Sequence, residues 1–397
     1  MRLLCPLNLK YPIIGIPSKN GRVYAVCRTC ALARRKRPCP GHSTEKRAFD
    51  VTITVVELVE CVKMKYDILR MYEAALYTAK EPIFRQYMNL LIREKVIHSQ
   101  VPQDSDCYIS ALNTKLGYDA PSMENLKVRS SDIQFNPMLR YIAKLSCNSI
   151  SGKFGQTNDT RCVLVNSYEE IKSHYFSKSL LDLRCYTENE CYLTLKKKKQ
   201  KFNRNRHLVV AAYLTAFGRL SITRAINILD QNGAVPLYVD VDGLKVLVPK
   251  RSGLPKEIKV SGLPGEFKLE HGDKVVVCWV GAAPKSYSFI FIDQEKHMKE
   301  HVCCKGLSIS NKTSKSILNY DAYKRHLFCF LQGMKCVTRV PQFRKLAIDN
   351  YSKEDLINSK KFCMISFTID NLSKRNIDFT SPLLLTTPFG FHKDTDI

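Results

Sequence analysis

Two aspartates separated by one residue form the first group in this sequence that could perform chemistry. Asp240 and Asp242 lie between two runs of β-forming residues, 237–239 and 244–248. Side chains two positions apart on an extended strand point to the same side, so both carboxylates can face one cation. Mg²⁺ is usually held by one or two carboxylates plus substrate phosphates. The alternative is that Asp242 and Gly243 form a tight turn and that Asp240 is an ordinary surface residue.

A second candidate group is a polar stripe within residues 138–154. Arg140, Lys144, Asn148 and Gly152 recur every four residues, so they share one face of a predicted helix. The two cations could bind a triphosphate, and the side-chain amide and the exposed glycine backbone would let the attached base approach the helix. A solvated helix face is the alternative. Gly152 favours ligand binding or close packing, because a mid-helix glycine costs about 1 kcal/mol relative to Ala.

Three cysteines and a histidine form a third group. Cys27, Cys30, Cys39 and His42 have the spacing Cys-x2-Cys-x8-Cys-x2-His. Sulfur and imidazole ligands at such spacings are compatible with a tetrahedral structural Zn²⁺. A bound ion would also explain how a segment rich in Arg and Lys, with few large apolar residues, becomes ordered. Reduced cysteines in a basic loop are the alternative.

The elements that must position these groups can be read from periodicity and turn residues. We expect short strands in residues 1–26, helices at 138–154 and 208–229, a hairpin around 240–243, and strands at 274–280 and 286–292. Asn136 and Pro137 predict a cap and a first-turn proline for the 138–154 helix. Residues 51–97 show helical apolar spacing at Leu58, Val62, Tyr66, Leu69, Tyr72 and Leu76.

Composition narrows the class of protein. The 397 residues are 45% hydrophobic and 25% charged, which is typical of a globular chain and excludes disorder as the main state. The formal net charge of +25 predicts an anionic partner, either nucleic acid or an anionic membrane face. No stretch approaches the ~20 uninterrupted apolar residues of a spanning helix, so we expect no membrane insertion.

The cysteines and the first residues indicate a compartment. Residues 1–6 lack the apolar core of a secretory signal. Sixteen cysteines are scattered along the chain, including the adjacent pair Cys303 and Cys304, rather than arranged as in a short disulfide scaffold. We therefore expect an intracellular, reducing compartment, the nucleus or the cytoplasm.

Five segments, in order, carry a resemblance to the family B DNA polymerases. The segments are Lys144-x3-Asn148-Ser149-x-Ser151-Gly152, Tyr238-Val239-Asp240-Val241-Asp242-Gly243, Gly262-Leu263-Pro264-Gly265-Glu266-Phe267, Pro284-Lys285-Ser286-Tyr287 and Lys305-Gly306-Leu307. The first resembles the fingers motif Lys-x3-Asn-Ser-x-Tyr-Gly, and the second resembles the palm motif Tyr-x-Asp-Thr-Asp-Ser. The chain is most similar to the protein-primed branch, including the polymerases of Polinton/Maverick-type elements and related viruses.

The resemblance implies template-directed nucleotidyl transfer with two Mg²⁺ ions. Asp240 and Asp242 would hold metal, Arg140 and Lys144 the triphosphate, and Asn148 and Gly152 the nucleotide pocket. DNA would be bound by Lys285, Tyr287 and Lys305, and by the run Lys196, Lys197, Lys198 and Lys199, for which a solvated loop is the alternative. The implied partners are a DNA primer-template, deoxynucleoside triphosphates and a terminal protein as primer.

The implied fold class is α+β, an incomplete right-hand polymerase with part of a palm, helical fingers and a small thumb. We expect palm-derived strands at 1–26, a cysteine-containing and helical insertion at 27–125, fingers at 126–160, a basic connecting segment at 161–205, palm at 206–306 and a thumb-like region at 307–397.

Departures from the family pattern modify the expected activity. The upstream Asp-x-x-Ser-Leu-Tyr-Pro motif, which supplies another metal-binding Asp, does not occur in the sequence. Ser151 replaces an aromatic residue, and Val241 and Gly243 replace Thr and Ser. These differences suggest a truncated copy that binds DNA with reduced or no polymerase activity alone. The alternative function is a non-catalytic nucleic-acid-binding protein that retains the fold. A zinc-stabilised membrane-surface protein fits poorly, because no basic segment carries the needed apolar stripe.

Overall fold

The chain divides into two compact units. A computed structural model describes residues 1–18, 21–79, 81–100, 105–156, 160–177, 179–185, 190–196, 207–270, 274–293, 295–309, 312–345, 360–369, 375–379, 381, 383 and 385–392. Unit 1 comprises residues 1–155, 207–270 and 374–397, and unit 2 comprises residues 156–206 and 271–373. Each is therefore assembled from segments that are distant in the sequence.

Unit 1 contains an N-terminal module (residues 1–70) built around a small antiparallel sheet. Strands β1 (Arg2–Leu4), β4 (Phe49–Asp50) and β5 (Asp67–Arg70) pair in the order β4-β1-β5, and β2 (Ile16–Ser18) pairs with β3 (Gly21–Val23). Helices α1 (Arg28–Leu32), α2 (Thr44–Arg47) and α3 (Val55–Lys63) lie between these strands in the sequence. One apolar core, which includes Leu3, Ile14, Phe49 and Tyr66, joins residues 1–26 to residues 27–66.

The helical expectation for residues 51–97 is wrong in its middle part. Helix α3 ends at Lys63, and Lys65 has a φ of +59°, which turns the backbone out of the helix. Leu69 then lies in strand β5, because the edge of β1 offers backbone hydrogen-bonding partners to residues 67–70. Tyr72 and Leu76 lie in a segment without regular structure, and the next helix, α4, begins at Arg85.

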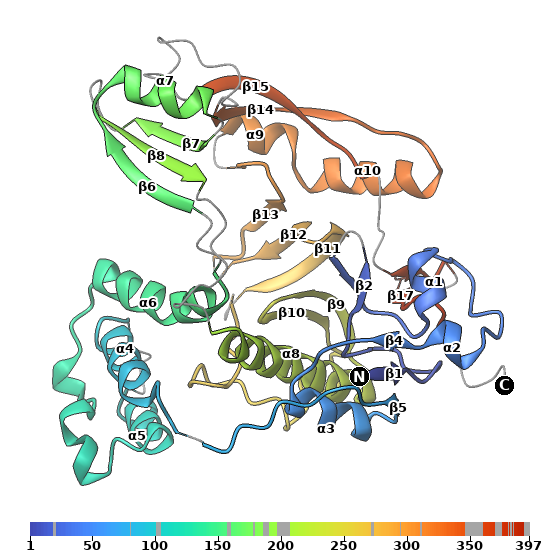
Figure 1. The fold of residues 1–397 in the computed structure, drawn as a ribbon, viewed down its shortest axis with the longest axis horizontal. Helices are drawn as coiled ribbons and strands as arrows, with labels where there is room; N and C mark the ends of the chain where they lie inside the picture. The colour runs from blue at the N-terminus through green and yellow to red at the C-terminus, as the bar shows by residue number, and fades with distance from the viewer. Residues whose placement is uncertain are drawn as a thin grey trace. The chain divides into compact units, whose positions relative to one another are not determined.

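The rest of unit 1 is mainly helical. It contains α4 (Arg85–Ile97), α5 (Ser105–Leu116), the 3₁₀ turns η1 (Pro121–Leu126) and η2 (Ser130–Asp132), α6 (Pro137–Gly155) and α8 (Leu208–Gln231). Strands β9 (Val235–Asp240) and β10 (Gly243–Leu247) form the predicted hairpin. Helix α6 packs against α4 and α8, and α8 packs against α3 and β9, so α8 connects the stripe-bearing helix to the hairpin (Figure 1).

In its described residues, unit 2 contains two three-stranded sheets with separate apolar cores and one two-stranded sheet. Strands β6 (Thr160–Val165), β7 (Leu180–Cys185) and β8 (Cys191–Lys196) pair in the order β6-β8-β7, with α7 (Tyr168–Phe176) between β6 and β7 in the sequence. Residues 161–205, expected to be a connecting segment, thus include a small sheet whose core contains Leu183, Leu193 and Leu195.

The second sheet of unit 2 has the order β11-β12-β13, from β11 (Val275–Ala283), β12 (Ser286–Ile292) and β13 (Met298–Cys304). It is followed by α9 (Lys312–Ile317), α10 (Tyr320–Leu331) and the paired strands β14 (Thr338–Lys345) and β15 (Lys360–Phe367). Tyr323 of α10, Val340 of β14 and Phe367 of β15 share one core with this sheet.

The last described segment returns to the N-terminal module. Strands β16 (Asn376–Ile377) and β17 (Thr386–Thr387) pair with each other, and β17 lies beside α1 in Figure 1. Phe389 is buried in the module's apolar core. Residues more than 340 positions apart in the sequence therefore form one packed region.

The observed mixture of helices and small antiparallel sheets is compatible with the expected α+β class. The helices at 138–154 and 208–229, the hairpin around 240–243, and the strands at 274–280 and 286–292 are confirmed as α6, α8, β9-β10, β11 and β12. Among the described residues, α8 is long and apolar enough to cross a membrane. Arg219 and Arg224 of α8 pair with Glu57 and Glu60 of α3, so we interpret α8 as a core helix of unit 1.

Candidate functional site

The hairpin presents its two aspartates from a tight turn rather than from an extended strand. Asp240 pairs with Gly243, which leaves Val241 and Asp242 as the loop. Val241 has a φ of +48°, so the backbone is not extended between the two carboxylates, and the same-face argument from the sequence does not apply. Asp240 is half-buried and Asp242 is exposed. The tight turn favoured by Asp242 and Gly243 is therefore present, with both carboxylates at the tip of the hairpin.

A divalent cation at this tip would have two carboxylates as candidate ligands. Within the described part of the chain, Asp240 and Asp242 belong to no group of three or more potential ligands whose atoms lie within 4.8 Å of one another. Two carboxylates fit Mg²⁺ that keeps several waters and binds substrate phosphates. They do not by themselves form a complete cage.

Helix α6 begins as the sequence predicts. The Asn136 side chain accepts hydrogen bonds from the backbone amides of Met138 and Leu139, both at 3.1 Å, and Pro137 is the first residue of the helix. This cap fixes the start of the helix and with it the direction of the stripe. Lys144, Asn148 and Gly152 are exposed, whereas Arg140 is half-buried. The side chain of Ser151 lies outside the described residues.

Gly152 and Gly155 behave differently within α6. A Cβ atom on Gly155 would lie 3.6 Å from the Cβ of Ala211, so this glycine sits at the contact with α8. A Cβ atom on Gly152 would meet no described atom within 4 Å. Close packing therefore does not explain Gly152, and its bare backbone faces open space next to Asn148 on the stripe.

The structure brings further cations to the start of the stripe. The Arg140 Nε donates a hydrogen bond of 3.0 Å to Ser99 Oγ, which in turn donates one of 2.6 Å to the backbone oxygen of Lys95. Burial lowers the pKa of the Lys95 ammonium, and the charges of Arg140, Lys144 and Lys268 lower it further, whereas Cys147 acts in the opposite direction. Arg140, Lys144 and Lys268, from α6 and the segment after the hairpin, are thus near enough to Lys95 of α4 to act on its charge, and we call these four cations the cation cluster.

Sequence reasoning missed Lys95 and Lys268. Lys95 lies in the last turn of α4, where a basic residue is unremarkable because it faces the negative end of the helix dipole. Only the packing of α4 against α6 brings it to Arg140. No local pattern in the sequence contains that information, because the two residues are 45 positions apart.

The proposed DNA-contacting residues lie in unit 2. In the β12-β13 ladder Ser286 pairs with Cys304, so Lys285 and Lys305, each one residue beyond this pair, lie at the same end of the ladder. Tyr287 is half-buried and stacks on Trp279 with ring centroids 4.8 Å apart. Lys196 is exposed at the end of β8, and the predicted contacts at Lys197, Lys198 and Lys199 lie outside the described residues.

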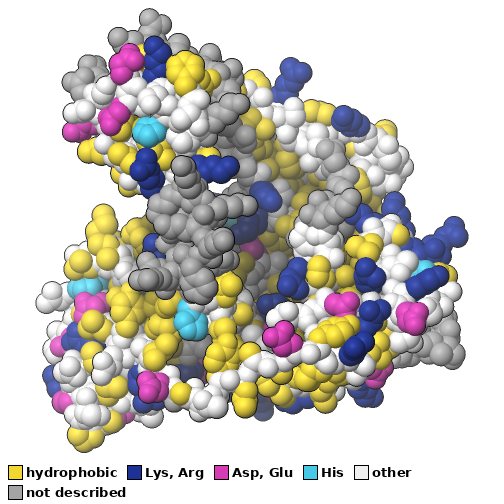
Figure 2. Space-filling model, viewed as in Figure 1, with side chains coloured by type: hydrophobic (Ala, Val, Ile, Leu, Met, Phe, Trp, Pro, Cys, Tyr) yellow, Lys and Arg dark blue, Asp and Glu magenta, His cyan; other side chains and the backbone are white. Residues whose placement is uncertain are grey.

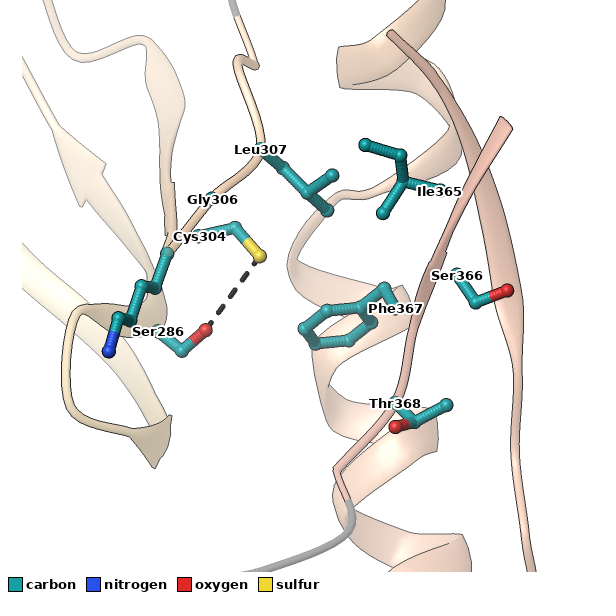
Figure 3. A pocket seen from close by; sticks show the side chains of 9 residues that line it. Ser286, Cys304, Gly306, Leu307, Ile365, Ser366, Phe367 and Thr368 are labelled. Carbon is teal, nitrogen blue, oxygen red and sulfur yellow. Dashed lines mark hydrogen bonds between the residues drawn. The ribbon is translucent and has the colours of Figure 1, made fainter. Parts of the chain in front are cut away.

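A small cavity of about 180 Å³ adjoins Lys305. It is lined by Ser286, Cys304, Lys305, Leu307, Phe367 and Thr368, among others. Figure 3 shows the Ser286 hydroxyl directed at the Cys304 sulfur, at 3.7 Å. The hydroxyls and one ammonium group can accept a polar group no larger than a phosphate or a few waters. The cavity therefore adds polar surface next to Lys305-Gly306-Leu307.

The three cysteines and the histidine converge as the sequence predicts. The sulfur atoms of Cys27, Cys30 and Cys39 lie 3.4, 3.6 and 3.4 Å from the Nδ1 of His42. In tetrahedral zinc sites Zn–S is about 2.3 Å and Zn–N about 2.0–2.1 Å, which separates sulfur and nitrogen by about 3.6 Å. All three cysteines are buried, and burial raises the pKa of the Cys27 and Cys30 thiols. The residues present therefore fit one tetrahedral ion, which would hold the sulfurs as thiolates.

A second group of potential ligands, Asp293, Glu295 and His297, lies in the β12-β13 turn. Lys299 forms an ion pair of 2.5 Å with Asp293 and, as the largest cause, holds the pKa of that carboxyl below its ordinary value. Glu295 and His297 are exposed. We assign no metal to this group, because its most enclosed carboxylate already has a cationic partner.

Comparison with known proteins gives a distant match. No protein-family model and no solved structure matches the chain. Its sequence is similar to that of a probable DNA polymerase of Neurospora intermedia, with 24% identity over 169 residues. The match covers 42% of this chain and 16% of that protein, so the chain spans a small part of the relative's length.

Proposed function

We propose that this chain is derived from a DNA polymerase and binds deoxynucleoside triphosphates and DNA. Similarity to a probable DNA polymerase supports the proposal over part of the chain. The motifs at residues 136–307 add the finer proposal of the protein-primed branch of family B, in which a terminal protein is a partner. They also suggest a right-hand arrangement, with fingers around α6 and a palm around β9-β10.

The cation cluster is the observation that carries this proposal. Lys95 is half-buried next to Arg140, and among the described residues the charged groups that shift its pKa are three cations, which lower it, and the Cys147 thiol, which raises it. Like charges held together without a partner destabilise a fold, and a bound polyanion removes that repulsion. A triphosphate lying along Arg140 and Lys144 would do so and would place its base toward Asn148 and Gly152.

Mg²⁺ is the cation that this site would use. Asp240 and Asp242 would hold it, and when bound it would neutralise charge on the phosphates. The hairpin contributes the two carboxylates at its tip, and the α6 stripe contributes the charges that orient the phosphates. Because no further His, Cys, Asp or Glu among the described residues forms a group of three within 4.8 Å with Asp240 and Asp242, we expect the purified chain to have little or no polymerase activity alone.

Nucleotide binding tests the cation cluster directly. Titration of the full chain with a fluorescent dATP analogue and Mg²⁺ should show saturable binding. The Lys144→Ala and Arg140→Ala variants should each bind at least about tenfold more weakly, because one charge-assisted hydrogen bond contributes about 1.5–3 kcal/mol. Lys63→Ala, which removes an exposed cation from α3, is the matched control and should bind normally. Equal affinities in all four proteins would contradict the proposal.

Primer extension tests the catalytic part. We expect no more than trace extension of a primed template by the purified chain. Robust extension that is abolished in the Asp242→Ala variant would show a working polymerase and would overturn the proposed loss of activity. Loss of primer extension in the Asp242→Ala variant would also identify Asp242 as a catalytic residue.

A second candidate function is non-catalytic nucleic-acid binding on a polymerase fold. The exposed turn position of Asp242 favours it, because an Asp-Gly turn is an ordinary feature of a β-hairpin tip. The two functions differ in their need for the carboxylates. If Asp240→Asn and Asp242→Asn leave Mg²⁺-dependent dATP binding unchanged, the non-catalytic function is the better description.

We also propose a structural Zn²⁺ at Cys27, Cys30, Cys39 and His42. The sulfur-to-nitrogen distances and the burial of the cysteines support this ion. Metal analysis of the purified chain should find one zinc per molecule. The Cys30→Ser variant should lose it, and Cys162→Ser, at an exposed cysteine, should keep it.

A further inference from the structure

Positive charge is concentrated around the Cys3His group. Residues 22–47 contain eight Lys or Arg residues and a single acidic residue, Glu45. Six of the eight are arginines, the side chain best suited to paired hydrogen bonds with phosphate oxygens. This short stretch thus holds a large share of the +25 net charge, outside the cation cluster and the Lys196–Lys199 run.

The exposed members of this stretch form one surface, which we call the basic surface. Its members are Arg22, Arg28, Arg34, Lys36, Arg37 and Lys46. Figure 2 shows dark-blue side chains gathered over the region of α1 and α2, the helices that contain Arg28 and Lys46. Within the described part of the chain, none of Arg28, Arg34, Lys36 and Arg37 forms an ion pair with a carboxylate. Their charges are therefore available to an external anion.

The metal ligands hold the loop that carries this charge. Arg34, Arg35, Lys36 and Arg37 lie between Cys30 and Cys39, so an ion at the Cys3His group ties both ends of the loop. The Arg35 amide donates to the backbone oxygen of Cys30 at 2.9 Å, and the Arg35 Nε donates to the Pro38 oxygen at 3.2 Å. Arg34 has a φ of +48°, which turns the chain sharply after α1. Cations held by such a loop lose less entropy on binding than cations on a flexible tail.

We propose that the basic surface binds the phosphate backbone of nucleic acid, as a contact separate from the nucleotide and primer contacts. The bracing of the loop rests on the zinc site proposed above, whereas the contact of its cations with phosphates does not, and neither requires nucleotidyl transfer. An anionic membrane is a poorer fit, because Leu32 is the one large apolar side chain exposed between the described residues 28 and 47. An arginine-rich surface that is held by a metal ion and lacks an apolar stripe is suited to phosphates. Binding to phosphates would not depend on the base sequence.

The salt dependence of DNA binding tests the proposal. The affinity of the full chain for a labelled duplex would be measured at several salt concentrations and compared with that of the R34Q/K36Q/R37Q triple variant. Each phosphate contact contributes about 0.9 to the slope of log affinity against log salt, so the slope should fall by up to about 2.7. The control triple variant K250Q/R251Q/K256Q removes three exposed cations elsewhere in unit 1 and should change the slope less.

Removal of zinc provides a second test of the proposal. A zinc-selective chelator should reduce DNA affinity to that of the R34Q/K36Q/R37Q variant, and added zinc should restore it. The same chelator should leave the affinity of that variant unchanged, because the cations of the loop that the metal holds are already replaced. Absence of zinc from the purified chain would refute the zinc site alone, since the triple-variant comparison needs no metal.

Three results would overturn the proposal. The first is an unchanged slope in the R34Q/K36Q/R37Q variant, provided that its zinc content and circular dichroism match the parent. The second is an equal reduction in both triple variants, which would show that net charge alone governs binding. The third is unaltered DNA binding together with loss of binding to an acidic protein partner, which would make this surface a protein interface.

Discussion

At the scale of single residues, backbone conformation marks two of the positions identified by their chemistry. Val241, between the two aspartates, has a φ of +48°, and Lys285, at the predicted primer contact, has a φ of +57°. For residues with a Cβ atom this region costs roughly 1–2 kcal/mol. Such strain persists where the surrounding structure imposes it, and it recurs at functional sites. Both residues lie in tight turns between paired strands, β9-β10 and β11-β12.

Replacement of Val241 by Asn should stabilise the chain by about 1 kcal/mol, because Asn tolerates the left-handed region better than a β-branched residue. Val241 is 78% exposed, so little buried apolar surface is lost. Chemical denaturation monitored by fluorescence would give the free energy of unfolding. Val239→Asn, in β9 at 45% exposure, is the control and should not stabilise. Equal effects of the two substitutions would show that Val241 is not strained.

Lys95 should lower stability at neutral pH in the absence of an anion. Burial, then the charges of Arg140 and other neighbouring groups, hold its pKa below the ordinary value, so the folded state disfavours the charged form. Below the folded pKa both states are protonated and the penalty is complete. As pH rises through the folded pKa toward the unfolded value of about 10.4, the folded state loses its proton first and stability rises.

The Lys95→Met variant should therefore melt slightly higher than the parent at pH 7. We expect roughly 1–2 °C, since a partly exposed group contributes less than about 1 kcal/mol. The gain should shrink toward pH 10, and stabilisation by pyrophosphate should be weaker in the variant. Thermal unfolding at the two pH values, with and without pyrophosphate, measures all three effects. A lower melting temperature of the variant at pH 7 would mean that Lys95 is structurally favourable.

At the scale of elements, local patterns predicted most of what the structure shows. Helix α6 and its Asn136 cap, helix α8, the β9-β10 hairpin and the Cys3His group all depend on residues within about 25 positions of one another. The predictions that failed or were missed depend on distant partners. Strand β5 forms because β1 pairs with it, and Lys95 reaches Arg140 because α4 packs against α6. The periodicity of apolar residues carries no information about contacts with residues that are distant in the sequence.

The segment after β17 is another feature that depends on distant partners. Gly390 has a φ of +82°, and a Cβ atom there would lie 2.9 Å from the Cβ of Cys27 and 3.3 Å from that of Cys30. The amide of Val26 donates to the oxygen of Phe389 at 3.2 Å, and His392 Nε2 lies 2.7 Å from the backbone oxygen of Cys39. The proposed metal centre therefore supports this segment, and the segment encloses the metal centre.

Replacement of Gly390 by Ala should weaken zinc binding. The added methyl group would displace the backbone that contacts Cys27 and Cys30, so we expect release of zinc to a chromogenic chelator to become at least about tenfold faster, equivalent to about 1.4 kcal/mol. Gly253→Ala is the matched control. Its φ is +64°, but a Cβ atom there meets nothing within 4 Å, so it bears the same backbone cost without the contact. Equal release rates in the two variants would contradict this account.

At the scale of the whole molecule, the functional groups are divided unequally between the units. Unit 1 contains the cation cluster, the two aspartates and the proposed metal centre, whereas unit 2 contains Lys285, Tyr287 and Lys305. Each unit has apolar cores of its own, with Leu3, Ile14 and Phe49 in unit 1 and Tyr323, Val340 and Phe367 in unit 2. The polyanion contacts proposed above therefore fall on both units.

Calorimetry of the full chain should show two unfolding transitions, because chains with several separate cores depart from two-state behaviour. Zinc chelation should lower one transition, and dATP with Mg²⁺ should raise that same transition, since both sites lie in unit 1. A ligand at 100 times its Kd adds about 2.7 kcal/mol to the stability of the unit that binds it. Val340→Ala, at a fully buried position of unit 2, should lower the other transition alone by about 2 kcal/mol. If zinc and dATP instead shifted different transitions, the metal centre and the nucleotide site could not share one cooperative unit, and the assignment of both to unit 1 would fail.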